Sequence, residues 1–339
     1  MIENNLPLGK LPATLLAQLL ETISVRDPQV LLGPGTGLDC AVVEFGEKLL
    51  VLKTDPITFA TEAIGEYLVQ INANDIATTG GRPRWLLVTL LLPEGSTSEE
   101  SATYIFGQIV EAADRIGVTV IGGHTEITYG LDRPIAVGTL IGEVERSKLI
   151  TPRGAQPGHR LLFTKGMAIE ATAIAAREFN DRLAPFLSDA ELDQAAAYLT
   201  NPGISVLPDA QIATGAGIVS AMHDPTEGGL AAAAWELAEA CGHTLVLDPS
   251  TFPITPLSLK ICQALEIDPV ASISSGAMLV TAPLSDTSRI INDLDLHGIP
   301  CVEIGWLESG PPKVWIEVKR GRTLLYRPER DEITRLFDA

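Results

Sequence analysis

Short apolar runs that suit β-strands alternate with longer helical patterns along this chain of 339 residues. Strand-like runs occur at 49–52, 85–88 and 118–121, and they are rich in leucine, valine and isoleucine. The segments between them carry apolar residues at the spacing of one helix face. This alternation predicts a mixed α/β or α+β protein.

Several of the predicted helices have recognisable ends. Thr97 and Glu100 have the spacing of a capping box, and Gly117 follows the last apolar position, so a helix is expected over 98–116. A second helix is expected over 64–79, ending at Gly80. Other helical patterns lie at 11–20, 168–178, 189–199 and 229–240.

The length of the chain favours two domains, because single hydrophobic cores stop growing near roughly 250–300 residues. A cluster of proline and glycine at 151–160 separates two strand-like runs and marks the boundary. We therefore predict an N-terminal domain over 1–150 and a C-terminal domain over 155–318. The remaining segment, 319–339, is expected to form a hairpin turn and a terminal helix.

The charge balance excludes several classes of partner. The formal net charge is −19 and the sequence pI is about 4.6, so the protein repels nucleic acid and anionic membrane surfaces. No bilayer-spanning apolar run and no C-x-x-C pair occur among its residues, which predicts a cytoplasmic protein with reduced thiols. An acidic protein that handles a polyphosphate must bring cations to it, so the carboxylates are candidate metal ligands.

Four carboxylate or amide side chains in the first half are candidate ligand-binding groups because of their positions. Asp39 follows a glycine-rich loop that either cradles an anion or is a plain turn; it is not a Walker P-loop. Asp55 ends a predicted strand, where it would face a ligand or cap a helix. Asn72 and Asp75 share one helix face beside apolar residues, and a carboxylate there requires a partner or a metal.

Two glycine-containing segments complete the candidates. Gly122 and Gly123 follow a strand, where they allow close approach to phosphate, and His124 is either an acid–base group or a structural histidine. In the second half, Asp224, Thr226 and Glu227 precede a helix whose N-terminus can receive phosphate. The alternative for these three residues is an ordinary helix N-cap segment.

Together these motifs resemble one family in order and character from about residue 33 to residue 279. The chain is similar to the superfamily of aminoimidazole ribonucleotide (AIR) synthase, selenophosphate synthetase, thiamine monophosphate kinase and HypE. The family pattern G-x-G-D-D-C/A-A aligns with GTGLDCA, in which Asp39 matches the second aspartate and Leu38 replaces the first. The other matching segments are Thr54-Asp55, Asn74-Asp75-Ile76-Ala77, Ile121–Thr125, Asp224–Leu230 and, for the HypE-like branch, a strand over Ile273–Leu279.

This resemblance implies a two-domain AIR synthase-like fold, in which the N-terminal half forms a β-barrel across a homodimer. ATP and Mg²⁺ would lie between the two halves, with an unknown small-molecule or protein-borne acceptor. The implied metal ligands are Asp39, Asp55, Asp75, Asp224 and Glu227. The implied nucleotide contacts are Gly122, Gly123, Thr226, Asn74 and Thr54, and the implied catalytic residues are Asp224, Glu227 and His124.

The departures from the family pattern leave three functions open. HypE ends in a cysteine that carries the carboxamide it dehydrates, whereas this sequence ends Arg335-Leu336-Phe337-Asp338-Ala339. No reactive cysteine of the selenophosphate synthetase type occurs in the N-terminal segment. The first expectation is an enzyme that phosphorylates an amide or carbonyl oxygen; the alternatives are a small-molecule kinase and a nucleotide-binding accessory protein.

Overall fold

The computed structural model describes residues 6, 8–58 and 62–337, which form two compact units. The N-terminal unit contains Val25–Gly33 and Asp39–Leu149. The C-terminal unit contains the described residues up to Ser24, together with Pro34–Leu38 and the chain from Ile150 onward. This division differs from the predicted domains 1–150 and 155–318, because the first helix and the glycine-rich loop cluster with the C-terminal part of the chain.

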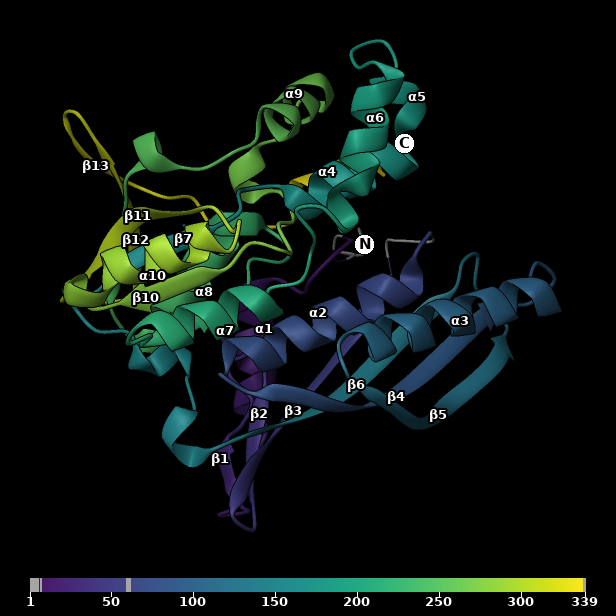
Figure 1. The fold of residues 1–339 in the computed structure, drawn as a ribbon, viewed down its shortest axis with the longest axis horizontal. Helices are drawn as coiled ribbons and strands as arrows, with labels where there is room; N and C mark the ends of the chain where they lie inside the picture. Colours follow the sequence, from purple (N-terminus) through teal and green to yellow (C-terminus); the bar gives the residue numbers. More distant parts are fainter. Residues whose placement is uncertain (1–5, 7, 59–61, 338–339) are drawn as a thin grey trace, which may run out of the picture. The chain divides into compact units, whose positions relative to one another are not determined.

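The N-terminal unit is a six-stranded sheet with the strand order β1-β2-β3-β6-β4-β5. All neighbouring strands are antiparallel except β4 and β5, which are parallel. Helices α2 and α3 lie on the same side of this sheet in Figure 1. The strands are β1 (Val30–Leu32), β2 (Ala41–Phe45), β3 (Lys48–Ile57), β4 (Arg82–Pro93), β5 (Thr119–Thr128) and β6 (Ile135–Val144), and the helices are α2 (Ile64–Thr78) and α3 (Glu99–Arg115).

The burial pattern of β6 explains how α2 is held on the sheet. Every second residue of β6 is buried, including Ala136 and Leu140, while the residues between them are half-buried. The buried residues face α2, which is itself buried along nearly its whole length. The predicted helices at 64–79 and 98–116 are confirmed. The α3 cap is one residue later than expected, because Ser98 and Ser101 form the capping box in place of Thr97 and Glu100.

The six-stranded sheet is open within the described residues of this unit, with β1 and β5 at its edges. The face that α2 and α3 do not cover carries half-buried Leu52, Leu91, Val137 and Ile141, and Leu87 is 36% exposed. An uncovered apolar face beside an open strand edge is unusual in a monomer, since both features favour association.

The C-terminal unit is built on a seven-stranded sheet with the order β13-β12-β9-β11-β7-β10-β8. Its core is formed by β7, β9, β10 and β11 with the alanine-rich helix α8, and includes Phe163, Leu237 and Leu247. The strands are β7 (Arg160–Thr164), β8 (Ala221–His223), β9 (Thr244–Leu247), β10 (Leu279–Ala282), β11 (Cys301–Glu308), β12 (Lys313–Val318) and β13 (Gly321–Leu324). The helices are α1 (Ala13–Glu21), α4 (Ile169–Glu178), α5 (Asn180–Leu183), α6 (Asp189–Ala196), α7 (Leu207–Ala216), α8 (Gly229–Cys241), α9 (Pro256–Leu265) and α10 (Leu284–Leu296), with short 3₁₀ turns between them.

Two predictions for this unit need correction. The hairpin at 319–321 is present between β12 and β13, but the expected terminal helix is only a short 3₁₀ segment, Glu332–Leu336, and residues 338–339 lie outside the described part. The strand expected over 273–279 is irregular until β10 begins at Leu279. Among the described residues, no helix is both long and apolar enough to cross a membrane.

Candidate functional site

Strand β3 presents Lys53 and Asp55 on the face that α2 covers, because residues two apart on a strand share a side. Asp75 of α2 meets them there. The Lys53 Nζ lies 2.9 Å from Oδ2 of Asp75 and 3.3 Å from Oδ2 of Asp55. The structure therefore brings together two of the predicted metal ligands, with an ammonium group in contact with both.

The electrostatics of this group are set by its acidic residues. Burial alone would lower the pKa of Lys53, but the carboxylates of Asp75, Asp55 and Asp39 outweigh it and raise the pKa well above its usual range. Lys53 is thus a fixed positive charge at neutral pH. Asp39 belongs to the same electrostatic group as Asp55 and Asp75.

Two further predicted residues lie close to this group in sequence but have other surroundings. Asn74 is completely buried on α2. Thr54 points to the opposite face of β3, where its Oγ1 donates a hydrogen bond to the carbonyl oxygen of Gly138. Its hydroxyl thereby links β3 to β6, in addition to any role with a nucleotide.

The segment with Gly122, Gly123 and His124 lies on strand β5 itself, and not after a strand as expected. The pairing with β4 shifts by one residue at Gly122, which makes a β-bulge there. A Cβ atom at Gly123 would lie 1.8 Å from the carbonyl oxygen of Val88, so strand pairing alone requires that glycine.

The His124 side chain is exposed, and its Nε2 lies 3.0 Å from Oε2 of Glu126. This hydrogen bond, with one from Thr128, lowers the pKa of Glu126. Strands β4 and β6 separate β5 from β3, so the structure does not bring His124 to Asp55 within this unit.

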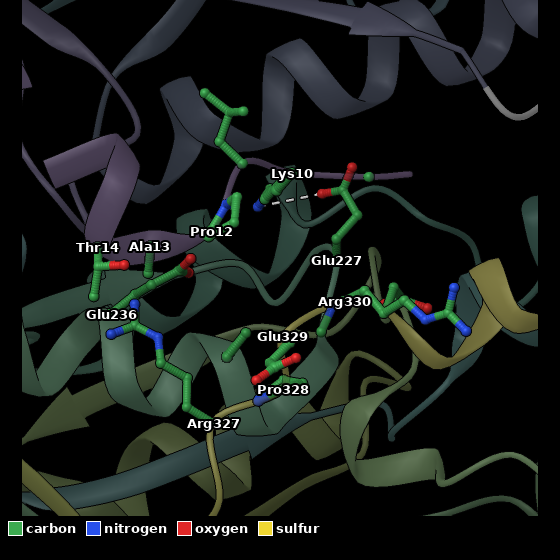
Figure 2. Close-up of a pocket in the computed structure, with 15 residues that line it drawn as sticks. Lys10, Pro12, Ala13, Thr14, Glu227, Glu236, Arg327, Pro328, Glu329 and Arg330 are labelled. Atoms are coloured by element: carbon green, nitrogen blue, oxygen red, sulfur yellow. Dashed lines mark hydrogen bonds and ion pairs between the residues drawn. The ribbon is translucent and has the colours of Figure 1, made fainter. Parts of the chain in front are cut away.

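In the C-terminal unit, Thr226 and Glu227 meet Lys10 of the N-terminal segment. The Lys10 Nζ donates a hydrogen bond to Oγ1 of Thr226 at 2.9 Å and lies 3.2 Å from Oε2 of Glu227. Lys10 and Glu227 both line a pocket of about 460 Å³. Figure 2 shows their contact as a dashed line. Burial alone would raise the pKa of Glu227, but Lys10 holds it below the usual value. The neighbouring Asp224 is buried.

The start of α8 explains how this loop is held. Gly228 and Gly229 both have positive φ, and a Cβ atom at Gly229 would lie 2.4 Å from the carbonyl oxygen of Ser272. Gly228 is the N-cap, and α8 has no side-chain cap hydrogen bond. The N–H of Gly228 instead donates a hydrogen bond to Oδ2 of Asp331 at 2.5 Å. Glu227 therefore does not serve as an ordinary N-cap of α8, which was the alternative role for this segment.

Two buried carboxyl groups belong to the same part of the C-terminal unit. Burial raises the pKa of Glu170 to about 8, and the nearby carboxylates of Glu227 and Asp331 add to the shift. Burial also raises the pKa of Asp331 to about 7, although the N–H groups of Gly228 and Ile333 oppose this. Asp331 lines the pocket with Lys10 and Glu227.

The glycine-rich loop before Asp39 has a packing role. Gly37 has a φ of 69°, and a Cβ atom there would lie 2.4 Å from the carbonyl oxygen of Glu236 on α8. Close contact with α8 thus requires this glycine, and the loop's composition is not by itself a sign of phosphate binding.

Four charged residues of these sites were not predicted from the sequence. Lys53 could have been found, because it stands two positions before Asp55 on a predicted strand. Lys10 and Glu170 carry a weaker signal, as single charges in otherwise apolar segments. Asp331 lies in a strongly charged C-terminal segment and gives no sequence signal of its burial.

Both halves of the chain match domains of one known protein family. Residues 37–144 match the N-terminal domain of AIR synthase related proteins, and residues 156–316 match the C-terminal domain of the same family. A protein of Methanocaldococcus jannaschii named as a hydrogenase expression/formation protein is 29% identical over 88% of this chain and 88% of its own length. The carbamoyl dehydratase HypE of Cupriavidus necator is 26% identical over 73% of this chain and 69% of its own length.

Solved structures share the same fold. A hydrogenase maturation protein HypE in complex with ATP has a TM-score of 0.70 and 21% identity, covering 95% of this chain and 94% of its own. A ThiL complexed with AMPPCP and TMP has a TM-score of 0.70 and 19% identity, covering 92% of this chain and 95% of its own.

The chain belongs to the AIR synthase-related family. Within that family, its relatives named HypE place it in the HypE-like branch.

Proposed function

We propose that this chain is an ATP- and Mg²⁺-dependent enzyme of the AIR synthase/HypE type that phosphorylates an amide or carbonyl oxygen. Phosphorylation activates that oxygen for loss in a dehydration or substitution. The observation that carries the proposal is the pairing of predicted ligands with lysines in both units, Asp55 and Asp75 with Lys53 and Glu227 with Lys10. In both units, the ammonium group of a lysine already lies next to acidic side chains.

The donor atoms of these residues fit Mg²⁺, which prefers carboxylate oxygens. Asp39, Asp55 and Asp75 would hold it in the N-terminal unit, and Asp224 and Glu227 in the C-terminal unit. When bound, Mg²⁺ would neutralise the charge of the phosphates and of the group being transferred. The buried setting of Asp75 and Asp224 strengthens each of these interactions because water is excluded.

The chain's own groups then position the nucleotide. The N–H groups at the start of α8 and the Lys10 ammonium offer positive charge to a phosphate, and the Thr226 hydroxyl offers a hydrogen bond. Further contacts with the nucleotide would come from Gly122, Gly123, Asn74 and Thr54. His124 would act as an acid–base group, with its imidazole oriented by Glu126.

The acceptor in this proposal is a small molecule or a group carried by a protein. A HypE has been solved in complex with HypF, which supports a protein-borne acceptor. The alternative is a small-molecule kinase that retains its phosphorylated product, which the likeness to ThiL with AMPPCP and TMP supports.

The proposal includes a homodimer that buries the uncovered face of the N-terminal sheet. The apolar side chains of that face, together with the open edge of β5, would be covered by the same surface of a second copy and would complete a barrel. Ile121 and Ile127 of β5 are 51% and 56% exposed, which fits an interface strand.

Calorimetric titration with ATP tests the proposed function. The wild-type protein should bind ATP in the presence of Mg²⁺ and much more weakly in EDTA. Asp75→Asn should weaken Mg²⁺-dependent binding severely, because the amide keeps the shape of the ligand but lacks its charge. Unchanged ATP affinity in this variant would remove Asp75 from the metal site.

A further inference from the structure

Lys53 occupies the position in the N-terminal unit where a cation would bridge the predicted metal ligands. Its Nζ contacts Asp75 Oδ2 at 2.9 Å and Asp55 Oδ2 at 3.3 Å. Asp75 and Lys53 are shielded from water, with exposures of 4% and 16%, whereas Asp55 is 34% exposed. One ammonium group thus contacts two carboxylates from two different elements, β3 and α2.

The ammonium group of Lys53 competes with a metal ion for the same carboxylate oxygens. Lys53 contacts Oδ2 of Asp75 and Oδ2 of Asp55, and carboxylate oxygens are also the donors that Mg²⁺ prefers. The ammonium group would repel a divalent cation bound beside it, and this repulsion is strong where water is excluded, as it is around Asp75.

We infer that Lys53 is a resident counter-ion that takes the place of a divalent cation between Asp55 and Asp75. Lys53 lowers the affinity of these two carboxylates for Mg²⁺ and keeps them in position before the metal arrives. This deepens the proposed function, on which it rests for the identity of the metal. Lys53 acts as a positioning residue that tunes metal affinity.

The C-terminal unit offers a matched control in Lys165. The Lys165 Nζ lies 2.8 Å from Asp209 Oδ2 and donates hydrogen bonds to the carbonyl oxygens of Ser205 and Gly276. It is more deeply buried than Lys53, with 6% exposure, but it contacts only one carboxylate, whose other oxygen accepts from Thr164. Removing this lysine costs stability without creating a set of metal ligands.

The experiment compares Lys53→Met with Lys165→Met and Lys53→Arg in nucleotide-free protein. Mn²⁺ binding is measured by the loss of free Mn²⁺ signal in electron paramagnetic resonance, and thermal unfolding is recorded in EDTA and in Mg²⁺. Lys53→Met should bind Mn²⁺ roughly tenfold or more tightly than wild type, because removal of the ammonium strengthens the field of the carboxylates. Its unfolding midpoint should fall in EDTA and recover by several degrees in Mg²⁺.

The controls separate this effect from a general loss of stability. Lys165→Met should unfold earlier in both EDTA and Mg²⁺, and Lys53→Arg, which keeps the charge, should bind Mn²⁺ as wild type does. If Lys53→Met folds only when Mg²⁺ is present, the inference is supported directly. If it folds under neither condition, Lys53→Gln is measured in the same way. Equal Mn²⁺ affinity in the folded Lys53 variants and the wild type overturns the inference.

The outcome is distinguishable from failure of the proposed function. The Mn²⁺ and unfolding measurements contain no nucleotide, so they report only on the carboxylate group and its lysine. ATP binding that is independent of Mg²⁺ in the wild type would end the proposed function, whatever the Lys53 variants show.

Discussion

The Nζ of Lys10 lies 3.2 Å from Oε2 of Glu227, although 216 positions separate Lys10 from the adjacent Thr226 that it also contacts. The N-terminal segment is thereby tied to the loop that begins α8. The pair is partly exposed, with side-chain exposures of 49% and 29%, so it contributes at most about 1 kcal/mol to folding. Its position at the pocket therefore suits a functional role better than a structural one.

Replacement of this lysine tests that conclusion. Lys10→Gln should lower ATP turnover roughly tenfold or more, because a positive charge near the transferred phosphate is lost, while the unfolding midpoint changes little. Lys48→Gln is the control, since Lys48 forms an exposed ion pair with Glu143 in the other unit. Phosphate release at saturating ATP and thermal unfolding are measured together. Normal turnover in Lys10→Gln would make the pair a surface contact only.

Glu170 gives a pH dependence of stability with a definite sign. Its pKa rises from a usual value of 4.5 to about 8 in the folded protein, so the folded state binds more protons between these values. The stabilising effect of protonation is fully present below pH 4.5 and is lost as the pH rises through 8. Its magnitude is at most about 5 kcal/mol.

Glu170→Gln should therefore unfold at a higher temperature than wild type at pH 9, and at a similar temperature at pH 5. The amide remains neutral at both pH values, so the variant avoids the cost of a buried charge. Asp193→Asn, an exposed site on α6, should show no such pH-dependent difference. If the unfolding temperatures of the wild type and Glu170→Gln change in parallel from pH 5 to pH 9, the raised pKa of Glu170 is contradicted.

Lys165 and Asp209 form a buried pair in which both partners matter to folding. Lys165→Met should cost about 3–5 kcal/mol, because it leaves the Asp209 carboxylate buried without its cation. The double variant Lys165→Met/Asp209→Leu should recover a large part of this loss, since it leaves no uncompensated charge. Denaturant unfolding measures the free energy of unfolding of both variants. An equal loss in the single and the double variant would show that the buried charge of Asp209 does not cause the destabilisation.

The sequence predicted α2 and α3 of the N-terminal unit and α1, α4, α6 and α8 of the C-terminal unit, because their periodicity and end signals are local, but it did not predict α7, α9 and α10. It predicted Asp55 and Asp75 as candidate ligands, because a strand position and a helix face are both readable from spacing, and in the structure both carboxylates contact Lys53. It did not predict Lys10 at the site, because the partners of Lys10 come from a distant segment, and it overlooked Lys53 although that lysine stands two positions before Asp55. Gly123 was predicted as a phosphate contact, and the loop that contains Gly37 as either an anion cradle or a plain turn, yet contacts with Val88 and Glu236 already require both glycines.

The proposed dimer is tested by a charge on the uncovered sheet face. Leu87→Glu should shift the protein from dimer to monomer in sedimentation at micromolar concentration, because the carboxylate would be buried in the interface. Tyr104→Glu is the control, as Tyr104 is 68% exposed on α3, on the opposite side of the sheet. A wild-type protein that sediments as a monomer would contradict the dimer.

The central claim is that carboxylates in this chain serve Mg²⁺-dependent phosphoryl transfer from ATP. The most direct test is phosphate release from ATP by wild type and Glu227→Gln, each with Mg²⁺ and with EDTA, alongside ATP affinity. We expect turnover by the wild type only with Mg²⁺, and a loss of about a hundredfold in Glu227→Gln with nearly normal ATP binding. Turnover that is the same in EDTA as in Mg²⁺, or that is normal in Glu227→Gln, would contradict it, and ATP binding without any turnover would indicate a nucleotide-binding accessory protein.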